Sequence, residues 1–200
     1  MATRKVLLLL CQGTELLEAA AFYDVLGWSG TYGSESVQVV TASSNLQVTC
    51  TFGMRVLADL RLSEVDPAQF DALAIPGGFE RFGFYEEAYS PRVQSVIAQF
   101  VALRKPVASI CVGALPLAKT GALVGRRATT YHLLEGRRRQ QLADLGACVV
   151  DESLVQDGPF ITSTSPATAT EVALRLLAEL TGTENARTVR HLMGFGDAAA

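Results

Sequence analysis

The chain has 200 residues, of which 49% are hydrophobic and 18% charged, and its formal net charge is -3 at pH 7. This length suits one domain with a substantial core. The small negative charge gives no electrostatic case for binding nucleic acid or an anionic membrane surface, and no segment approaches the length of a membrane-spanning helix. The four cysteines have no metal-like spacing. We therefore expect reduced thiols in the cytoplasm, with no metal and no cofactor.

The first half of the chain alternates apolar strand-like runs with helical patterns. The run over residues 5–11 is too short for a signal peptide, so we expect a buried first strand there. A helix is expected over 15–26, capped by Thr14 and closed by Gly27. The next expected elements are a strand over 37–42, a hairpin of 46–51 and 54–58, and a helix over 62–70.

The second half continues this alternation. The expected strands cover residues 71–75, 106–110, 128–131, 148–150, 154–156 and 160–162. The expected helices cover residues 91–103, 112–120, 134–145, 168–180 and 184–192. This order predicts an α/β fold, a doubly wound αβα sandwich with a mostly parallel central sheet. We expect a single domain over residues 1–196 and a frayed tail at 197–200.

The stretch from Val107 to Ala114 predicts a strand that turns directly into a helix at Cys111. This is the geometry of a nucleophile elbow, which holds the cysteine up at the edge of a sheet. The positive end of the following helix is expected to lower the pKa of the thiol and to favour the thiolate. The alternative is a buried cysteine that only packs, which is our expectation for Cys11, Cys50 and Cys148.

Two further loops are expected to converge on Cys111. In doubly wound sheets, ligands bind beyond the carboxyl ends of the strands, so the loops after 5–11 and 71–75 should meet there. The turn Pro76-Gly77-Gly78 lets backbone N–H groups approach a cleft. The amides of Gly78 and Val112 are therefore candidates to bind an oxyanion, although a glycine turn is also common without any such role.

Two titratable side chains are candidates to move protons. Glu18 is expected to point into the pocket or the core, where a partly protonated carboxyl beside a cysteine can hydrogen-bond the sulfur or shuttle a proton. His132 follows the expected strand 128–131, where a catalytic base would lie, with a structural histidine as the alternative.

For two other stretches, a structural role is either the expectation or the alternative to a role in binding. The irregular aromatic stretch 79–89 is expected either to wall the pocket or to form a dimer contact. The run Arg137-Arg138-Arg139 is interpreted as a solvated helix face.

Taken together, these pieces resemble the ThiJ/PfpI superfamily, which is related to class I glutamine amidotransferases. The matching segments are residues 13–18, 70–78, 108–114, 125–131 and 157–163. The resemblance implies a flavodoxin-like sandwich, a homodimer, and Cys111 as the elbow nucleophile. It also implies Glu18 as the acidic partner of that cysteine and the amides of Gly78 and Val112 as the oxyanion hole.

Several positions depart from the family patterns. Val112 stands where protease-like members have a histidine, so the Cys-His pair of that branch is missing. Tyr131 stands where glyoxalase-type members often have histidine, and His132 is shifted by one residue, which turns a strand side chain to the other face. Isonitrile hydratases share the pattern around Cys111 but typically have threonine at 112 and aspartate at 18.

The resemblance implies a cysteine-dependent enzyme that acts on a small electrophile, such as a reactive carbonyl, an amide or an isonitrile. Its chemistry would be of the hydrolase, lyase or hydratase type, with Cys111 and Glu18 as catalytic residues. His132, from its position after the expected strand, is the further catalytic candidate, and Gly77, Phe79 and Tyr131 are candidates for the pocket. One alternative is an oxidative-stress sensor that uses the same cysteine without turnover. A structural dimer or chaperone is the other.

Overall fold

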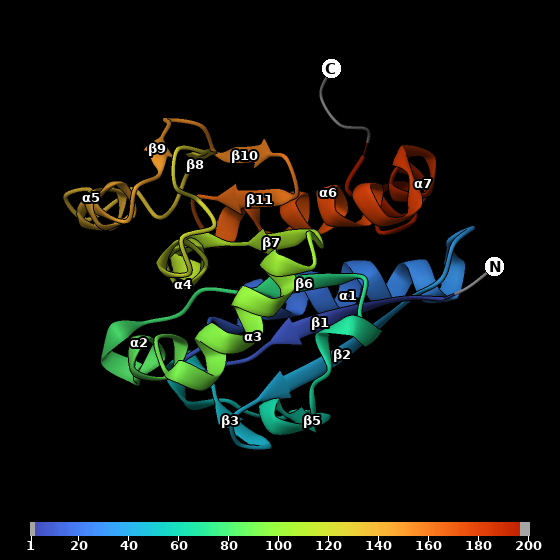
Figure 1. Cartoon of the computed structure of the whole chain (residues 1–200). Helices are drawn as coiled ribbons and strands as arrows, with labels where there is room; N and C mark the ends of the chain where they lie inside the picture. The colour runs from blue at the N-terminus through green and yellow to red at the C-terminus, as the bar shows by residue number, and fades with distance from the viewer. Residues whose placement is uncertain (1–2, 197–200) are drawn as a thin grey trace.

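The structure is a computed structural model that describes residues 3–196, so the expected tail at 197–200 lies outside it. Its centre is a seven-stranded sheet (Figure 1) in which only the edge strand β10 runs antiparallel to its neighbour. In spatial order the strands are β10 (Leu154–Asp157), β11 (Phe160–Ser163), β7 (Val107–Ser109), β6 (Ala72–Ile75), β1 (Arg4–Leu9), β2 (Val37–Ser43) and β5 (Leu60–Arg61).

The central strands are apolar because both of their faces are covered. Val6 to Leu9 of β1 and all of β6 are buried, as expected for parallel strands packed between two helical layers. Each fully buried leucine of this kind stabilises the fold by about 1.5–3 kcal/mol relative to an exposed one. The hydrophobic core therefore follows the sheet from β1 to β7.

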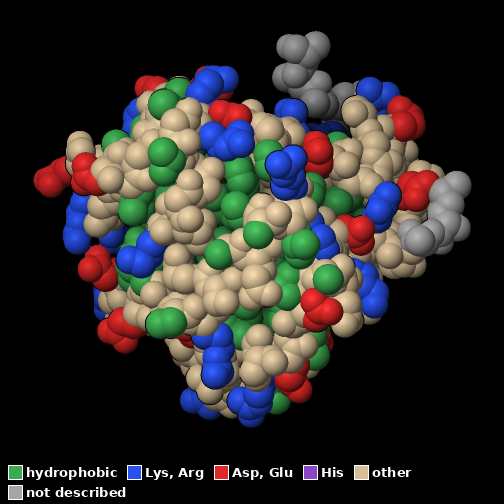
Figure 2. All heavy atoms as spheres, viewed as in Figure 1, with side chains coloured by type: hydrophobic (Ala, Val, Ile, Leu, Met, Phe, Trp, Pro, Cys, Tyr) green, Lys and Arg blue, Asp and Glu red, His purple; other side chains and the backbone are tan. Residues whose placement is uncertain are grey.

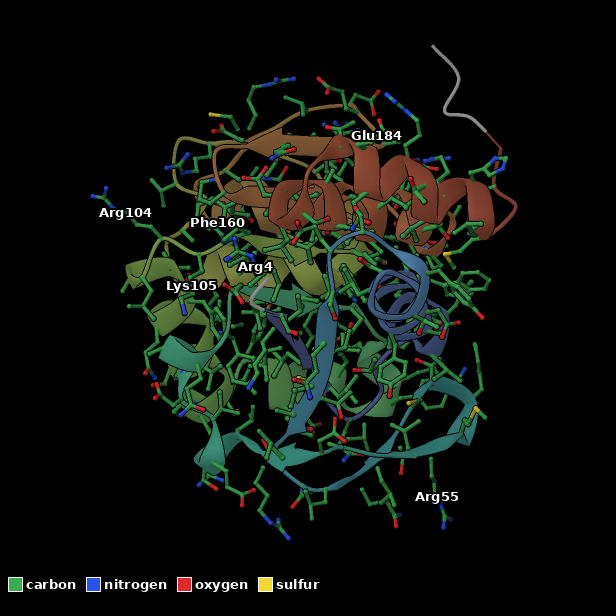
Figure 3. All side chains as sticks on the ribbon, turned by 90° about the vertical axis from the view of Figure 1, so that its right-hand side faces the viewer. Arg4, Arg55, Arg104, Lys105, Phe160 and Glu184 are labelled. Carbon is green, nitrogen blue, oxygen red and sulfur yellow. The ribbon has the colours of Figure 1, made fainter. Side chains whose placement is uncertain are left out.

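Seven α-helices lie within residues 3–196. They are α1 (Leu16–Tyr32), α2 (Phe84–Ala88), α3 (Pro91–Ala102), α4 (Ala114–Lys119), α5 (Arg137–Asp144), α6 (Ala169–Thr181) and α7 (Thr183–Leu192). Helices α1, α6 and α7 pack together on one face of the sheet, while α3 and α4 cover the other face with α2 and α5 beside them (Figures 1 and 3).

Two small sheets lie outside the central one. The predicted hairpin is confirmed as β3 (Gln47–Thr49) and β4 (Arg55–Leu57), which pair antiparallel, and Arg55 points outward from it in Figure 3. The predicted strand 128–131 is wrong as a member of the central sheet. Only β8 (Arg127–Ala128) is extended there, and it pairs with β9 (Cys148–Val149).

The first helix differs from its predicted bounds at both ends. Gly27 does not close it, since α1 continues to Tyr32. The cost of an exposed glycine inside a helix is only about 1 kcal/mol, and the packing of α1 on α6 and α7 outweighs it. Thr14 does not cap the helix either, because its hydroxyl accepts a hydrogen bond from the Cys11 amide at 3.0 Å.

Two other predicted helices are wrong in extent. The segment 62–70 forms two separate 3₁₀ turns, Leu62–Glu64 and Pro67–Gln69, with Asp66 capping the second through the Ala68 amide at 3.0 Å. The helix expected from residue 134 starts only at Arg137, because the residues from Leu134 to Gly136 all have positive φ. These backbones are set by local hydrogen bonds and turns that apolar periodicity does not detect.

The layers are those of a flavodoxin-like αβα sandwich, as predicted. None of the helices in the part described is long and apolar enough to cross a membrane. Basic and acidic side chains are interspersed on the face seen in Figure 2.

Candidate active site

Cys111 lies at the strained turn between β7 and α4. Its φ is 55°, in the left-handed region that non-glycine residues rarely adopt. The residues Cys111–Gly113 form a 3₁₀ turn that leads into α4. A strained backbone that places a reactive side chain at the end of a strand is the arrangement of a nucleophile elbow.

The end of β6 and the segment after β8 hold this turn from two sides. The Thr130 hydroxyl donates to the Cys111 carbonyl at 2.7 Å, and the Ile110 amide donates to the Ile75 carbonyl at 3.1 Å. A Cβ on Gly113 would lie 2.5 Å from the Ile75 oxygen. Only glycine therefore allows the elbow to pack this closely on β6.

Glu18 comes from the first turn of α1 and is completely buried. Its Oε2 accepts a hydrogen bond from the Gly77 amide at 2.6 Å, while Oε1 has no hydrogen-bond partner among residues 3–196. Burial raises the pKa of Glu18 to about 8, against the opposing effect of the Gly77 hydrogen bond. The carboxyl is thus mostly neutral at pH 7 and has a proton to donate.

Burial also raises the pKa of the Cys111 thiol, and the negative charge of an ionised Glu18 raises it further. The Val112 amide opposes both effects. The predicted lowering of this pKa by the helix end is therefore outweighed by burial. Because a neutral Glu18 carries no charge to oppose the thiolate, the protonation of Glu18 favours the reactive form of Cys111.

The loops after β1 and β6 meet beside this pair, as predicted. Thr14 and Gly78 form an isolated antiparallel bridge. A Cβ on Gly78 would lie 2.3 Å from the Gly13 carbonyl oxygen, so glycine is required for this approach. A Cβ on Gly77 would lie 3.0 Å from the Val112 nitrogen, which shows how closely the glycine turn approaches the elbow.

These residues open onto a cavity of about 730 Å³. Its walls include Cys111, Glu18, Gly78, Val112, Phe79, Tyr131, Glu15, Glu80, Arg81, Leu133, Leu134, Arg138, Ser165, Pro166 and Ala167. His132 is exposed and is not part of the wall. Tyr131 lines the wall and the next residue does not, so the predicted catalytic role of His132 has no support in this geometry.

Arg138 is one of the wall residues that the sequence did not predict; Leu133, Leu134, Ser165, Pro166 and Ala167 are the others. The sequence predicts a solvated helix face here, yet the Arg138 side chain is only 17% exposed and its Nη2 lies 2.8 Å from Glu80 Oε2. Its guanidinium stacks 4.6 Å from the centroid of the Tyr85 ring. The sequence feature that indicates burial of Arg138 is its position four residues before Leu142, which is buried on α5. Residues with this spacing share one helix face.

Two of the other three cysteines are buried as predicted, and the third is exposed. Cys11 and Cys50 are buried, as expected, whereas Cys148 is exposed rather than part of the core. It lies on the short β9, outside the central sheet. Among the described residues, no group of three or more His, Cys, Asp or Glu side chains is placed to hold a metal ion.

A cysteine raised at a strained strand-to-helix turn, beside a buried carboxyl, defines an αβα protein of the elbow-cysteine class. A model of the DJ-1/PfpI family matches residues 4–179. The chain belongs to the DJ-1/PfpI family, which confirms the resemblance found in the sequence.

Several relatives and one solved structure illustrate the match. The chain is 30% identical over 187 residues to dj-1beta of Drosophila melanogaster, covering 94% of this chain and 95% of the relative. The crystal structure of that fly protein aligns over 96% of this chain and 98% of its own, with a TM-score of 0.83 and 28% identity. A deglycase of Pyrococcus horikoshii is 35% identical over 122 residues, which cover 60% of this chain and 68% of the relative.

Some relatives are much longer than this chain. The DJ-1 homolog B of Arabidopsis thaliana is 30% identical over 187 residues, which make up 92% of this chain but only 40% of the plant protein. The match with DJ-1 homolog A of the same plant covers 46% of that protein. The chain thus spans less than half the length of these two relatives.

Proposed function

We propose that this protein is a cysteine-dependent enzyme acting on a small electrophile, with a reactive carbonyl as the leading substrate class and an amide or isonitrile as the others. The observation that carries the proposal is the placement of Cys111 and the buried carboxyl of Glu18 on one cavity. The relatives named as deglycases support carbonyl chemistry of the hydrolase or lyase type.

Each residue has a defined part in the proposed reaction. The Cys111 sulfur forms a bond to the electrophilic carbon, and the π electron pair moves onto the attached oxygen or nitrogen. The S–H bond of Cys111 breaks as the S–C bond forms. The Glu18 carboxyl relays the proton, accepting it on one oxygen and donating its own proton to the oxygen or nitrogen of the substrate, while the amides of Gly78 and Val112 stabilise the developing negative charge. Val112 follows Cys111 directly and His132 lies outside the cavity wall, so proton transfer falls to Glu18 rather than to a histidine.

Replacing the nucleophile tests this proposal. Cys111→Ala should lower turnover of methylglyoxal, or of whichever of an isonitrile and an amide the protein accepts, by at least about 1000-fold. Cys148→Ala is the matched control, because that cysteine is exposed and does not line the cavity. Its turnover should stay within about two-fold of the unmodified protein. Unchanged turnover in Cys111→Ala contradicts the proposal.

A redox sensor is the second candidate, since no histidine lies on the cavity wall among the described residues. Mild peroxide followed by peptide mass spectrometry separates the two functions. Sulfinic acid at Cys111 together with no turnover of any of these substrates supports the sensor. The expected homodimer, which sedimentation equilibrium would measure, and the cytoplasmic location both stay predictions.

A further inference from the structure

The cavity is large for the smallest electrophiles. Its volume of about 730 Å³ lies within the range of about 300–1,000 Å³ typical of drug-sized ligand sites. A two- or three-carbon carbonyl compound fills only a small part of that space. The remaining volume beside Cys111 is therefore available for a substituent on the substrate.

One wall of the cavity continues into an aromatic cluster. Phe79 lines the cavity and lies 5.9 Å from Phe52 and 6.3 Å from Phe82, between ring centroids. The rings meet in tilted and edge-to-face arrangements, which are the geometries that aromatic pairs prefer. Phe52 is 78% exposed and is held at φ 66°, so the chain keeps this ring in water despite backbone strain.

The segment Leu133–Leu134 adds apolar side chains that are also uncovered. Leu133 is 54% exposed and Leu134 is 80% exposed, although both line the cavity. Leu134 starts a run of three residues with positive φ, which sets the path of this wall. An apolar group bound in the cavity would remove these surfaces from water, and this is favourable in proportion to the area covered.

The charges around the cavity do not select for an ionic substrate. The cavity wall holds the carboxyl groups of Glu15 and Glu80 and the guanidinium groups of Arg81 and Arg138, and Glu18 is mostly neutral at pH 7. The Arg138 charge is already compensated, since its Nη2 lies 2.8 Å from Glu80 Oε2. Shape and apolar contact are therefore left to discriminate between substrates.

We infer that the cavity selects electrophiles that carry an aromatic or branched aliphatic group, with Phe79 packing on that group while the electrophilic carbon lies at Cys111. This inference rests on the proposed function only in taking Cys111 as the nucleophile. It makes Phe79 a specificity-determining residue, and it places aryl or branched dicarbonyls ahead of methylglyoxal as substrates.

Thiol alkylation tests this preference without requiring turnover. A maleimide adds the Cys111 sulfur to one alkene carbon and the thiol proton to the other, so N-phenylmaleimide and N-methylmaleimide differ only in their substituent. Each rate, followed by peptide mass spectrometry, is divided by the rate of the same reagent with N-acetylcysteine. The exposed Cys148 serves as the reference in the same chain.

The phenyl-to-methyl ratio should be at least about ten-fold higher at Cys111 than at Cys148, the discrimination that a well-fitted apolar pocket gives. Equal ratios overturn the inference, and so does a failure of both reagents to modify Cys111. A second copy covering Leu133 and Leu134 would also remove the preference and would overturn it.

Substitutions inside and outside the cavity wall show which side chain causes the preference of Cys111 for the phenyl reagent. Phe79→Ala should reduce the ratio at Cys111 about five-fold, because it removes the aromatic contact, and Phe79→Leu should restore part of it. Leu103→Ala also removes an exposed apolar side chain, but outside the cavity wall, and should leave the ratio unchanged. An unchanged ratio in Phe79→Ala overturns the inference.

Turnover of methylglyoxal without a phenyl preference overturns this inference alone, whereas a preference without any turnover contradicts only the proposed function.

Discussion

At the scale of single residues, Glu18 links the chemistry of the site to the stability of the fold. Its pKa rises from an ordinary value of 4.5 to about 8 because the carboxyl is buried. The folded protein therefore holds a proton that the unfolded chain loses near pH 4.5. The stability that Glu18 contributes is fully present below the unfolded pKa and is lost as the pH rises through the folded pKa of about 8.

Glu18→Gln should therefore stabilise the fold at neutral pH, because it removes the cost of burying an ionisable group. At pH 7 the variant should exceed the unmodified protein by about 3 kcal/mol in the free energy of unfolding, with a much smaller difference at pH 5. Urea unfolding at both pH values measures this. Glu86→Gln, at an exposed carboxyl, is the control and should change stability by less than about 0.5 kcal/mol. A Glu18→Gln difference that is the same at both pH values would contradict the expected ionisation.

At the scale of elements, two glycines show opposite constraints. Gly27 is exposed within α1, and a Cβ there would meet no atom within 4 Å. Gly113 is part of the elbow turn and packs against β6, where a Cβ would lie 2.5 Å from the Ile75 oxygen. One position therefore tolerates a side chain, and the other requires the close approach of two backbones.

Gly27→Ala should raise the free energy of unfolding by about 0.5–1 kcal/mol, because alanine loses less conformational entropy in a helix. Gly113→Ala should lower it by about 2 kcal/mol, because the elbow must move away from β6. Thermal unfolding of the pair measures both changes, and each variant is the control for the other. Destabilisation by Gly27→Ala would mean that α1 ends near residue 27 after all.

At the scale of the whole molecule, Asn185 connects the last helix to the first. It is 2% exposed, its Nδ2 donates to the Ser29 hydroxyl at 2.9 Å, and its Oδ1 accepts from the Ser34 amide at 2.8 Å. The two ends of the described chain are thus joined by a buried polar network. Such a network is costly when one member is removed, because its partners stay buried without hydrogen bonds.

Asn185→Ala should lower the free energy of unfolding by about 2 kcal/mol. Asn45→Ala, at an exposed loop asparagine, is the matched control and should cost less than about 0.5 kcal/mol. Urea unfolding measures both. Hydrogen exchange adds a test of location, since opening should increase in α7 and in the C-terminal part of α1. Equal stability of the two variants would show that the network contributes nothing to holding these helices together.

Local patterns were sufficient for the central strands, for most of the long helices and for the central residues of the site. Apolar runs predicted β1, β6 and β7, because buried parallel strands are apolar on both faces. The strand-to-helix change at Cys111 predicted the elbow, and the position of Glu18 on the first helical turn led to the carboxyl that lies beside it.

Long-range packing decided which side chains line the cavity and how they are charged. Tyr131 and His132 follow β8 in a segment without strand pairing, so the path of this segment in the tertiary structure decides that Tyr131 lines the cavity and His132 does not. The role of Arg138 depends on Glu80 and Tyr85, which lie more than fifty residues earlier in the chain. The amino-acid sequence by itself thus determined the sheet, the elbow and its cysteine, because these follow from local periodicity and turns. The protonation of Glu18 and the apolar cavity were decided only by folding, because burial and charge compensation come from segments distant in sequence.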